Sequence, residues 1–516
     1  DDDDVRRYAW QVISKTISIF QAVLFFNGNN AVLLYFFKDN LGWGDYAISA
    51  IQFLHVALYS LTMLVVIAFL TGALDPRDTA DLSEERWTIA DALLVNFEEP
   101  VDENNVRACQ KGDHKAKLSV TIDSYGLEVM VQKKPLEFES RKRRAQSWAT
   151  LLAHMGGFAA IAAGVSLQQA EPFRSSPGLC LIPVIATPLI LCTLFQASIV
   201  MRSMLKKQAM AQGRKGKRAA LVHETILEGE DDMLVLAMSF LIVQVVRFRI
   251  TGTLPNREGI EEPEPELTVT HIVLVLAAGL GFVILAICLI YVRGSLARNE
   301  KAKKAYAHQP PVAAEAAEKE ESSVERIFTI FIGACATACA WCVFCGARWA
   351  CMMRPIFGIE VLSIDGRIIL AVLMSGACFV LIYLLDKISD SMQAGGSDVE
   401  MANLTIESII GAASVLVGSS WEHSFDGAVT AMANLQPNHK LTLKFFLGIA
   451  VFAVMLRPWR RYILRRAMQL GELKVSRQMA SEAAKAQAED VLSARYQEVP
   501  LMNTEPPTTW LRCACA

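Results

Sequence analysis

Long blocks of apolar residues, separated by polar connections, dominate the hydrophobic pattern of this chain. Each block holds about 20 residues with few charges, the length that an α-helix needs to cross roughly 30 Å of hydrocarbon. The pattern therefore predicts ten transmembrane helices. They cover residues 12–37, 46–70, 148–167, 178–201, 233–250, 269–292, 327–351, 368–385, 406–431 and 441–456. The ninth is the weakest, because its apolar part is short before Trp421, and eight spans with a re-entrant ninth segment are the alternative.

Basic residues recur in every second connection between these spans. They gather in residues 141–144, 206–218, 293–304 and 460–466, whereas the odd-numbered connections are short and poor in Lys and Arg. Cytoplasmic loops of membrane proteins carry an excess of Lys and Arg. We therefore expect both termini in the cytoplasm and an even number of spans.

These elements predict an all-α fold, a polytopic transmembrane helix bundle with a mixed cytoplasmic loop insertion. The expected parts are spans 1 and 2 in residues 1–73, the loop in 74–147, spans 3–6 in 148–292, a linker in 293–326, spans 7–10 in 327–457, and an amphipathic helix with a disordered tail in 458–516. Alternating apolar residues over 118–132 predict a small β-hairpin in the loop, with a flexible loop as the alternative.

Composition supports a membrane protein and narrows its partners. The chain is 53% hydrophobic and 20% charged, whereas soluble domains are about 45–50% apolar and about 25% charged. A net charge of −3 is too small to indicate a nucleic-acid partner. The expected partners are the lipid bilayer and a small ion, with a second copy or another membrane protein left open. The chain opens on Asp1 rather than on Met, so targeting cannot be read from the start of this sequence.

Several segments are distinctive enough to compare with a known family. They read TISIFQAVLFFNGNN in the first span, WATLLAHMGGFAAI in the third, LAMSFLIVQVVRFRITGTLPNREG in the fifth and its exit, and LLDKISD and LVGSSWEHSFDGAV near the end. Together they resemble an expanded family of multi-span membrane proteins from dinoflagellate algae. The resemblance implies an integral multi-pass membrane protein. It implies no substrate, cofactor or functional residue.

Polar residues accumulate in the half of the spans that we expect to face outside. The ninth span carries Glu422, His423 and Asp426, and the two acids are four residues apart and share a helix face. The first two spans add Asn27, Asn29, Asn30 and His55. Ionisable groups in a bilayer are unfavourable and usually functional. We predict a water-accessible vestibule in which the acids bind a cation or proton and a histidine relays protons.

The favoured alternative is structural. In it, Glu422 and Asp426 pair with Lys444, Arg247 or Arg348 and hold helices together, or lie at the level of the lipid headgroups. Both interpretations use the same residues, so the geometry has to separate them.

Two other sets of residues are better explained by packing. Residues 27–30 could interrupt a helix and expose backbone groups to an ion, but hydrogen bonding between helices is favoured. The seventh span holds Cys335, Cys339, Cys342, Cys345 and Cys351. One straight helix cannot direct four ligands to one tetrahedral metal, so no metal site is predicted. His154 is also expected to be a packing residue.

Motifs of several functional classes do not occur in the sequence. There is no GxxxxGK[ST] loop, no TVGYG filter, and no HExxH or GxSxG motif. We therefore expect neither an enzyme nor a bound cofactor. The sequence favours a channel or secondary transporter for a small ion, with a cation preferred. The alternative is a non-transporting structural or scaffold protein of an organised membrane.

Overall fold

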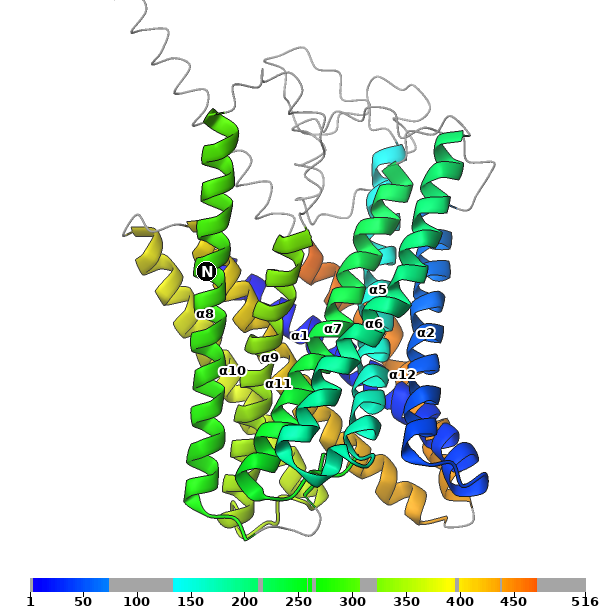
Figure 1. Ribbon diagram of the computed structural model, residues 1–516, viewed down its shortest axis with the longest axis vertical. Helices are drawn as coiled ribbons and strands as arrows, with labels where there is room; N and C mark the ends of the chain where they lie inside the picture. The colour runs from blue at the N-terminus through cyan, green and yellow to red at the C-terminus, as the bar shows by residue number, and fades with distance from the viewer. Residues whose placement is uncertain are drawn as a thin grey trace, which may run out of the picture. The chain divides into compact units, whose positions relative to one another are not determined.

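The computed structural model describes residues 3–73, 133–211, 217–257, 259–261, 266–306, 323–394, 399–436 and 439–470 of the 516-residue chain. The chain divides into two compact units, residues 1–86 with 129–467 and residues 87–128 with 468–516. The described helices belong almost entirely to the first unit (Figure 1). The hairpin predicted for residues 118–132, the linker after Tyr306 and the C-terminal tail lie outside the described residues.

Helices account for the regular structure of the described residues, which contain no strand beyond an isolated bridge between Ile356 and Ile359. The α-helices are α1 (Asp3–Leu34), α2 (Asp45–Leu70), α5 (Lys133–Gln168), α6 (Pro177–Ala211), α7 (Lys217–Thr251), α8 (Val269–Tyr306), α9 (Ser323–Met353), α10 (Ile364–Ala394), α11 (Val399–Asn434) and α12 (Lys440–Pro458). The π-helices η1 (Tyr35–Asn40) and η5 (Trp459–Ile463) extend α1 and α12, and the 3-10 turn η2 (Phe173–Ser175) precedes α6. The predicted all-α bundle is confirmed.

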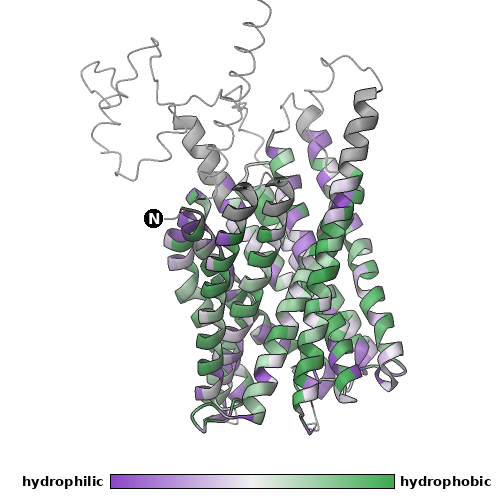
Figure 2. Cartoon of the chain, turned by 90° about the vertical axis from the view of Figure 1, so that its left-hand side faces the viewer, coloured by the Kyte–Doolittle hydropathy of each residue, from purple (hydrophilic) through white to green (hydrophobic). Residues whose placement is uncertain are grey.

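Nine of the described helices are long and apolar enough to cross a membrane, so the chain is an integral multi-pass membrane protein. Figure 2 shows hydrophobic residues along most of the length of these helices. The tenth long helix, α11, is not among the nine. It is nevertheless one continuous helix of 36 residues that packs against α1, α9 and α10. The re-entrant alternative is therefore not what the described residues adopt.

Successive helices run in opposite directions, so their connections alternate between two ends of the bundle (Figure 1). We call the end at which α1 begins the basal end and the opposite one the distal end. Distal connections are short, and hydrogen bonds tie them together. The Tyr46 hydroxyl, at the start of α2, donates to the carbonyl of Glu171 in the connection between α5 and α6. The basic clusters of the sequence predict that the basal end faces the cytoplasm.

The helices are arranged as an inner ring with one outer helix against each member. Five described helices close the ring, because α1 contacts α5, α5 contacts α7, α7 contacts α9, α9 contacts α11, and α11 contacts α1. The outer helices α2, α6, α8, α10 and α12 pack against α5, α7, α9, α11 and α1, respectively. Each outer helix thus packs against the inner helix that follows it in the chain, and the last one packs against the first.

Small residues allow these close contacts between helices. A Cβ atom added to Gly448 of α12 would lie 3.0 Å from the backbone oxygen of Leu24 in α1. A Cβ atom at Gly418 of α11 would lie 3.0 Å from the side chain of Ile19 in α1. Glycine at helix contacts lets backbones approach within a bilayer, where van der Waals packing rather than the hydrophobic effect holds helices together.

Replacing Gly448 with leucine is expected to separate α12 from α1. The added side chain would meet backbone rather than a movable side chain, and overpacking of this kind costs about 1–3 kcal/mol. The measurement is the apparent melting temperature of the purified protein in detergent. Gly281→Leu on α8 is the matched control, since nothing lies within 4 Å of its Cβ position. Equal melting temperatures for the two variants would contradict the close contact.

Candidate functional site

The middle of the helix ring is filled by apolar side chains. One buried hydrophobic cluster takes residues from all five inner helices, among them Ile19 of α1, Ile161 of α5, Leu236 of α7, Phe344 of α9 and Val415 of α11. These side chains come from every side of the ring and pack together. We call this set the central cluster. It separates polar groups at the distal end of the ring from polar groups at its basal end.

At the distal end, the structure brings the two predicted acids together with an amide and a lysine. The Asn27 side-chain amide of α1 donates to Glu422 Oε1 at 3.1 Å. Asp426 Oδ1 lies 3.1 Å from Lys444 Nζ of α12, and the same ammonium donates to Thr430 Oγ1 at 3.2 Å. We call Glu422, Asp426 and Lys444 the distal cluster. It joins α11 to α12, and Asn27 joins it to α1.

His423 lies beside the distal cluster but faces α9. Its ring centroid is 5.5 Å from that of Phe344, and its Nδ1 atom is 3.9 Å from Glu422 Oε2. Its backbone carbonyl accepts a hydrogen bond from Arg367 of α10 at 3.1 Å. A cavity of only about 20 Å³ lies next to it, room for about one water molecule.

The remaining predicted residues of the first two spans serve contacts between helices. Asn29 donates to the backbone oxygen of Phe25 within α1. Gln52 of α2 donates to Asn30 Oδ1 at 3.2 Å and accepts from Ser166 of α5 at 2.6 Å, which links three helices. α1 stays helical through residues 27–30, so these asparagines bond within and between helices, as the favoured interpretation expects.

His55 is also placed away from the acids. Its ring stacks on Tyr59 of the same helix with centroids 4.6 Å apart, and lies 5.9 Å from the ring of Phe26 in α1. The structure therefore unites Asn27, His423 and the two acids, but not His55, Asn29 or Asn30.

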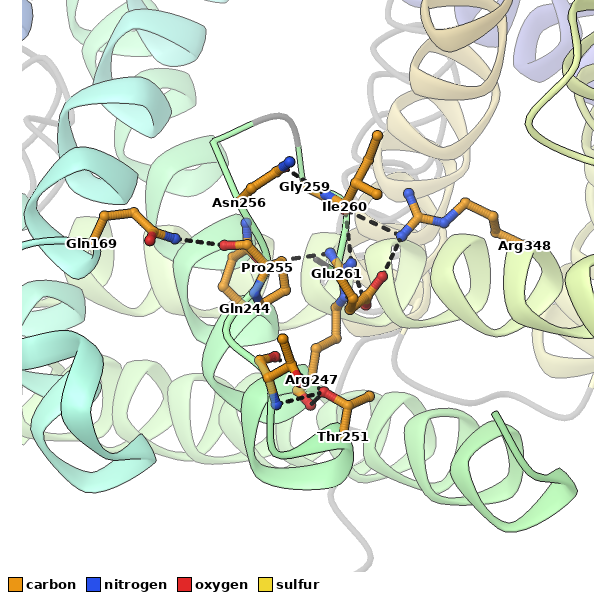
Figure 3. A network of polar contacts seen from close by, with 11 residues as sticks. Gln169, Gln244, Arg247, Thr251, Pro255, Asn256, Gly259, Ile260, Glu261 and Arg348 are labelled. Atoms are coloured by element: carbon orange, nitrogen blue, oxygen red, sulfur yellow. Dashed lines mark hydrogen bonds and ion pairs between the residues drawn. The ribbon is translucent and has the colours of Figure 1, made fainter. Parts of the chain in front are cut away.

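Arg247 and Arg348, two predicted partners of the acids, bind a different carboxylate (Figure 3). Arg247 Nε donates to Glu261 Oε1 at 2.9 Å, and Arg348 Nη2 donates to Glu261 Oε2 at 3.0 Å. Both guanidinium groups also donate to the carbonyl of Gly259. The predicted pairing with Glu422 or Asp426 is therefore wrong for the arginines. The connection between α7 and α8 folds back and supplies a nearer acid.

This folded-back connection, residues 259–261, covers the distal ends of α7 and α9. Gly259 adopts a positive φ of 73°, which glycine accepts without strain. The amide of Ile260 donates to Asn256 Oδ1 at 3.0 Å, and Gln169 donates to the carbonyl of Pro255 at 2.6 Å (Figure 3). Burial raises the pKa of Glu261, but the two arginines outweigh burial and hold that pKa below its ordinary value.

A second charged cluster, at the basal end, was missed by the sequence analysis. Glu228 and Asp232 of α7 are four residues apart and share a face. Lys15 of α1 interacts electrostatically with both acids and with His154 of α5, and Glu228 also interacts with Glu224 of α7 and Lys142 of α5. Since α5 lies between α1 and α7 in the ring, Lys15 and the two acids come from ring helices that are not neighbours. We call Glu228, Asp232 and Lys15 the basal cluster.

Lys15 also lies close to α11. Its Nζ would be 3.9 Å from a Cβ atom at Gly411, an ordinary van der Waals distance. Ser18 and His154 Nδ1 form a hydrogen bond of 2.9 Å nearby. The side chains of Lys15, Glu228 and Asp232 remain exposed. The four-residue spacing of Glu228 and Asp232 was the sequence signal for this cluster, but the span predicted from hydropathy began only at Met233.

Two other acids of α7 pair with arginines of neighbouring helices. Glu230, fully buried, accepts from Arg202 of α6 at 2.9 Å. Asp231 accepts from Arg326 of α9 at 2.6 Å. These pairs hold α7 between α6 and α9, and Glu228 and Asp232 lie on another face of the helix.

No family model, curated protein or solved structure matches the chain. The geometry of the helix ring therefore has to carry the functional argument.

The lowered pKa of Glu261 predicts how the stability of the protein changes with pH. A lowered folded-state pKa means that its ion pairs contribute fully above pH 4.3 or so, the ordinary glutamate value, and are lost as pH falls toward the folded-state pKa. Glu261→Gln is expected to lower stability at neutral pH by about 3–5 kcal/mol, because two buried arginines lose their acid. It should also flatten the fall in melting temperature between neutral pH and pH 3. The exposed Glu266→Gln is the control, and an unchanged pH profile in Glu261→Gln would refute the assignment.

Proposed function

We propose that this protein is a transporter for a small cation, with its path through the interior of the helix ring. The observation that carries the proposal is a repeated arrangement on the two sides of the central cluster. On each side one helix presents a glutamate and an aspartate four residues apart, and another helix presents a lysine that interacts with both acids. The distal set is Glu422, Asp426 and Lys444, and the basal set is Glu228, Asp232 and Lys15.

The charge balance of each cluster favours a cation. Each cluster brings two carboxylates to the lysine named with it, so the carboxylate without that lysine would carry an uncompensated negative charge when ionised, which is costly within a membrane protein. A monovalent cation or a proton would neutralise it. Oxygen ligands from carboxylates and the neighbouring amide of Asn27 are the kind that hard cations prefer.

The packed central cluster favours a secondary transporter over an open channel. Ile19, Phe344, Val415 and their neighbours close the ring between the two charged clusters. An ion could pass only if these side chains separate, as in a transporter that opens to one side of the membrane at a time. In this mechanism each lysine acts as a tethered cation that occupies the acids when no ion is bound.

One observation favours a structural role as the second candidate. Asp426 is already paired with Lys444, and Glu422 already accepts from Asn27. Contacts of this kind would also hold α1, α11 and α12 together in a scaffold protein that moves no ion. The two functions differ in what neutral variants do, because a scaffold would lose stability and a transporter would lose flux.

Replacing both distal acids tests the transport function. Glu422→Gln with Asp426→Asn should abolish cation flux into liposomes that contain the purified protein, because the only carboxylates of the distal cluster are gone. Flux is followed for several cations over a range of pH. The control is Glu360→Gln with Asp365→Asn, two exposed acids at the same end of the bundle. Undiminished flux in the distal variant, or no flux in the native protein, would reject the proposal.

Lys15 supplies a separate test at the basal end. If its ammonium competes with the transported cation for Glu228 and Asp232, Lys15→Gln should lower the cation concentration that half-saturates transport. Release would slow at the same time, so the maximal rate should fall. The exposed Lys206→Gln on α6 is the matched control. A half-saturating concentration that does not move would exclude competition by Lys15.

A further inference from the structure

A groove with apolar walls lies between the outer helices α8 and α10. Its volume is about 210 Å³. Ile287 and Ile290 of α8 form one wall and Ala377 of α10 the other. Cys339 of α9 and Ala412 of α11 form the floor, so the groove reaches down to two helices of the inner ring.

The groove follows from the way in which outer helices pair with inner ones. α8 packs on α9 and α10 packs on α11, and each pair is held mainly by its own contacts. Between the pairs, α9 and α11 present small side chains such as Ala340 and Ala412. Small floor residues under two separated outer helices leave an open space that the chain's described residues do not fill.

The mouth of the groove is continuous with the surface that faces lipid. Ile287 and Ala377 at its walls are exposed. Nearby large side chains on the same helices, Ile284, Phe379 and Val380, are more than half exposed. In a membrane this surface contacts hydrocarbon, so the groove opens into the hydrocarbon and not into water.

The lining defines the chemistry of what can occupy the groove. Among the described residues it contains no charged side chain, and its only hydroxyl groups are those of Thr405 and Ser408 near the basal end of α11. An apolar cavity of about 150 Å³ excludes water and accepts hydrocarbon the size of benzene. A space larger than that, open to the bilayer, is therefore filled by hydrocarbon.

We propose that the groove binds one acyl chain of a phospholipid from the basal leaflet. The chain lies between α8 and α10 against α9 and α11, and its headgroup lies toward Thr405 and Ser408. The bound chain bridges two outer helices that have few contacts with each other and supports the ring from outside. This lipid site does not depend on the proposal that the ring interior transports a cation.

Photolabelling of the full chain tests the site. The protein is reconstituted into phosphatidylcholine vesicles that contain a phospholipid with a diazirine in its acyl chain, and labelled peptides are identified after illumination. Binding in the groove predicts labels on α9 and α11 around Ala340 and Ala412, although both side chains are buried. Labels confined to exposed positions of α8 and α10 would overturn the proposal.

A matched pair of variants shows that the labels come from the groove. Ala377→Trp fills it from an exposed wall position and should reduce labelling of α9 and α11 several-fold. Ala277→Trp places the same side chain at an exposed position of α8 outside the groove and should leave that labelling unchanged. Equal labelling in both variants would refute the site.

A second variant and a competition experiment complete the test. If Ala377→Trp does not yield a monodisperse protein, Ile287→Trp fills the groove from the opposite wall and enters the same comparison. Excess unlabelled phospholipid should compete with the label. Competition by a sterol but not by phospholipid would assign the groove to another ligand and overturn the acyl-chain proposal.

Discussion

The need to keep ionisable side chains away from lipid governs this fold. Arg202, Glu230, Arg247, Glu261 and Arg348 are all buried, and each forms an ion pair with an opposite charge from another element. These pairs lie where the elements face one another, while the outer helices present aliphatic side chains to the bilayer. The surfaces that face lipid are therefore apolar, and the buried charged side chains lie on surfaces that face other parts of the protein.

The two charged clusters differ in how tightly they are closed. In the distal cluster Asp426 pairs with Lys444, and Glu422 accepts a hydrogen bond from Asn27. The folded-back connection that contains Glu261 lies at the same end of the bundle. The basal cluster keeps its three charged side chains exposed. Under the proposed transport function, a ring whose basal cluster is the more exposed corresponds to one of the two states that alternating access requires. The central cluster would then have to open for an ion to pass between the two charged clusters.

Hydropathy alone was enough to predict the helices, because a bilayer demands long apolar segments whatever their neighbours are. It was also enough to place Lys444 among the partners of Asp426, since both lie at the same end of adjacent helices. It failed for Arg247 and Arg348, because Glu261 reaches them only through the conformation of a connection. It also hid Glu228 and Asp232. α7 begins at Lys217, well before its apolar stretch, so these acids belong to the helix although the hydropathy pattern excludes them.

The contact between α12, an outer helix late in the chain, and α1 has a consequence for biogenesis. Each of α2, α6, α8 and α10 meets its inner partner as soon as the next helix is synthesised, but α1 receives its outer neighbour only when α12 emerges. Until then the carbonyl of Ser14 lacks the indole of Trp459, which donates to it at 3.0 Å in the finished protein. The first of the described helices is therefore the last to gain its outer neighbour, and a nascent chain stalled before residue 440 would leave that face of α1 uncovered.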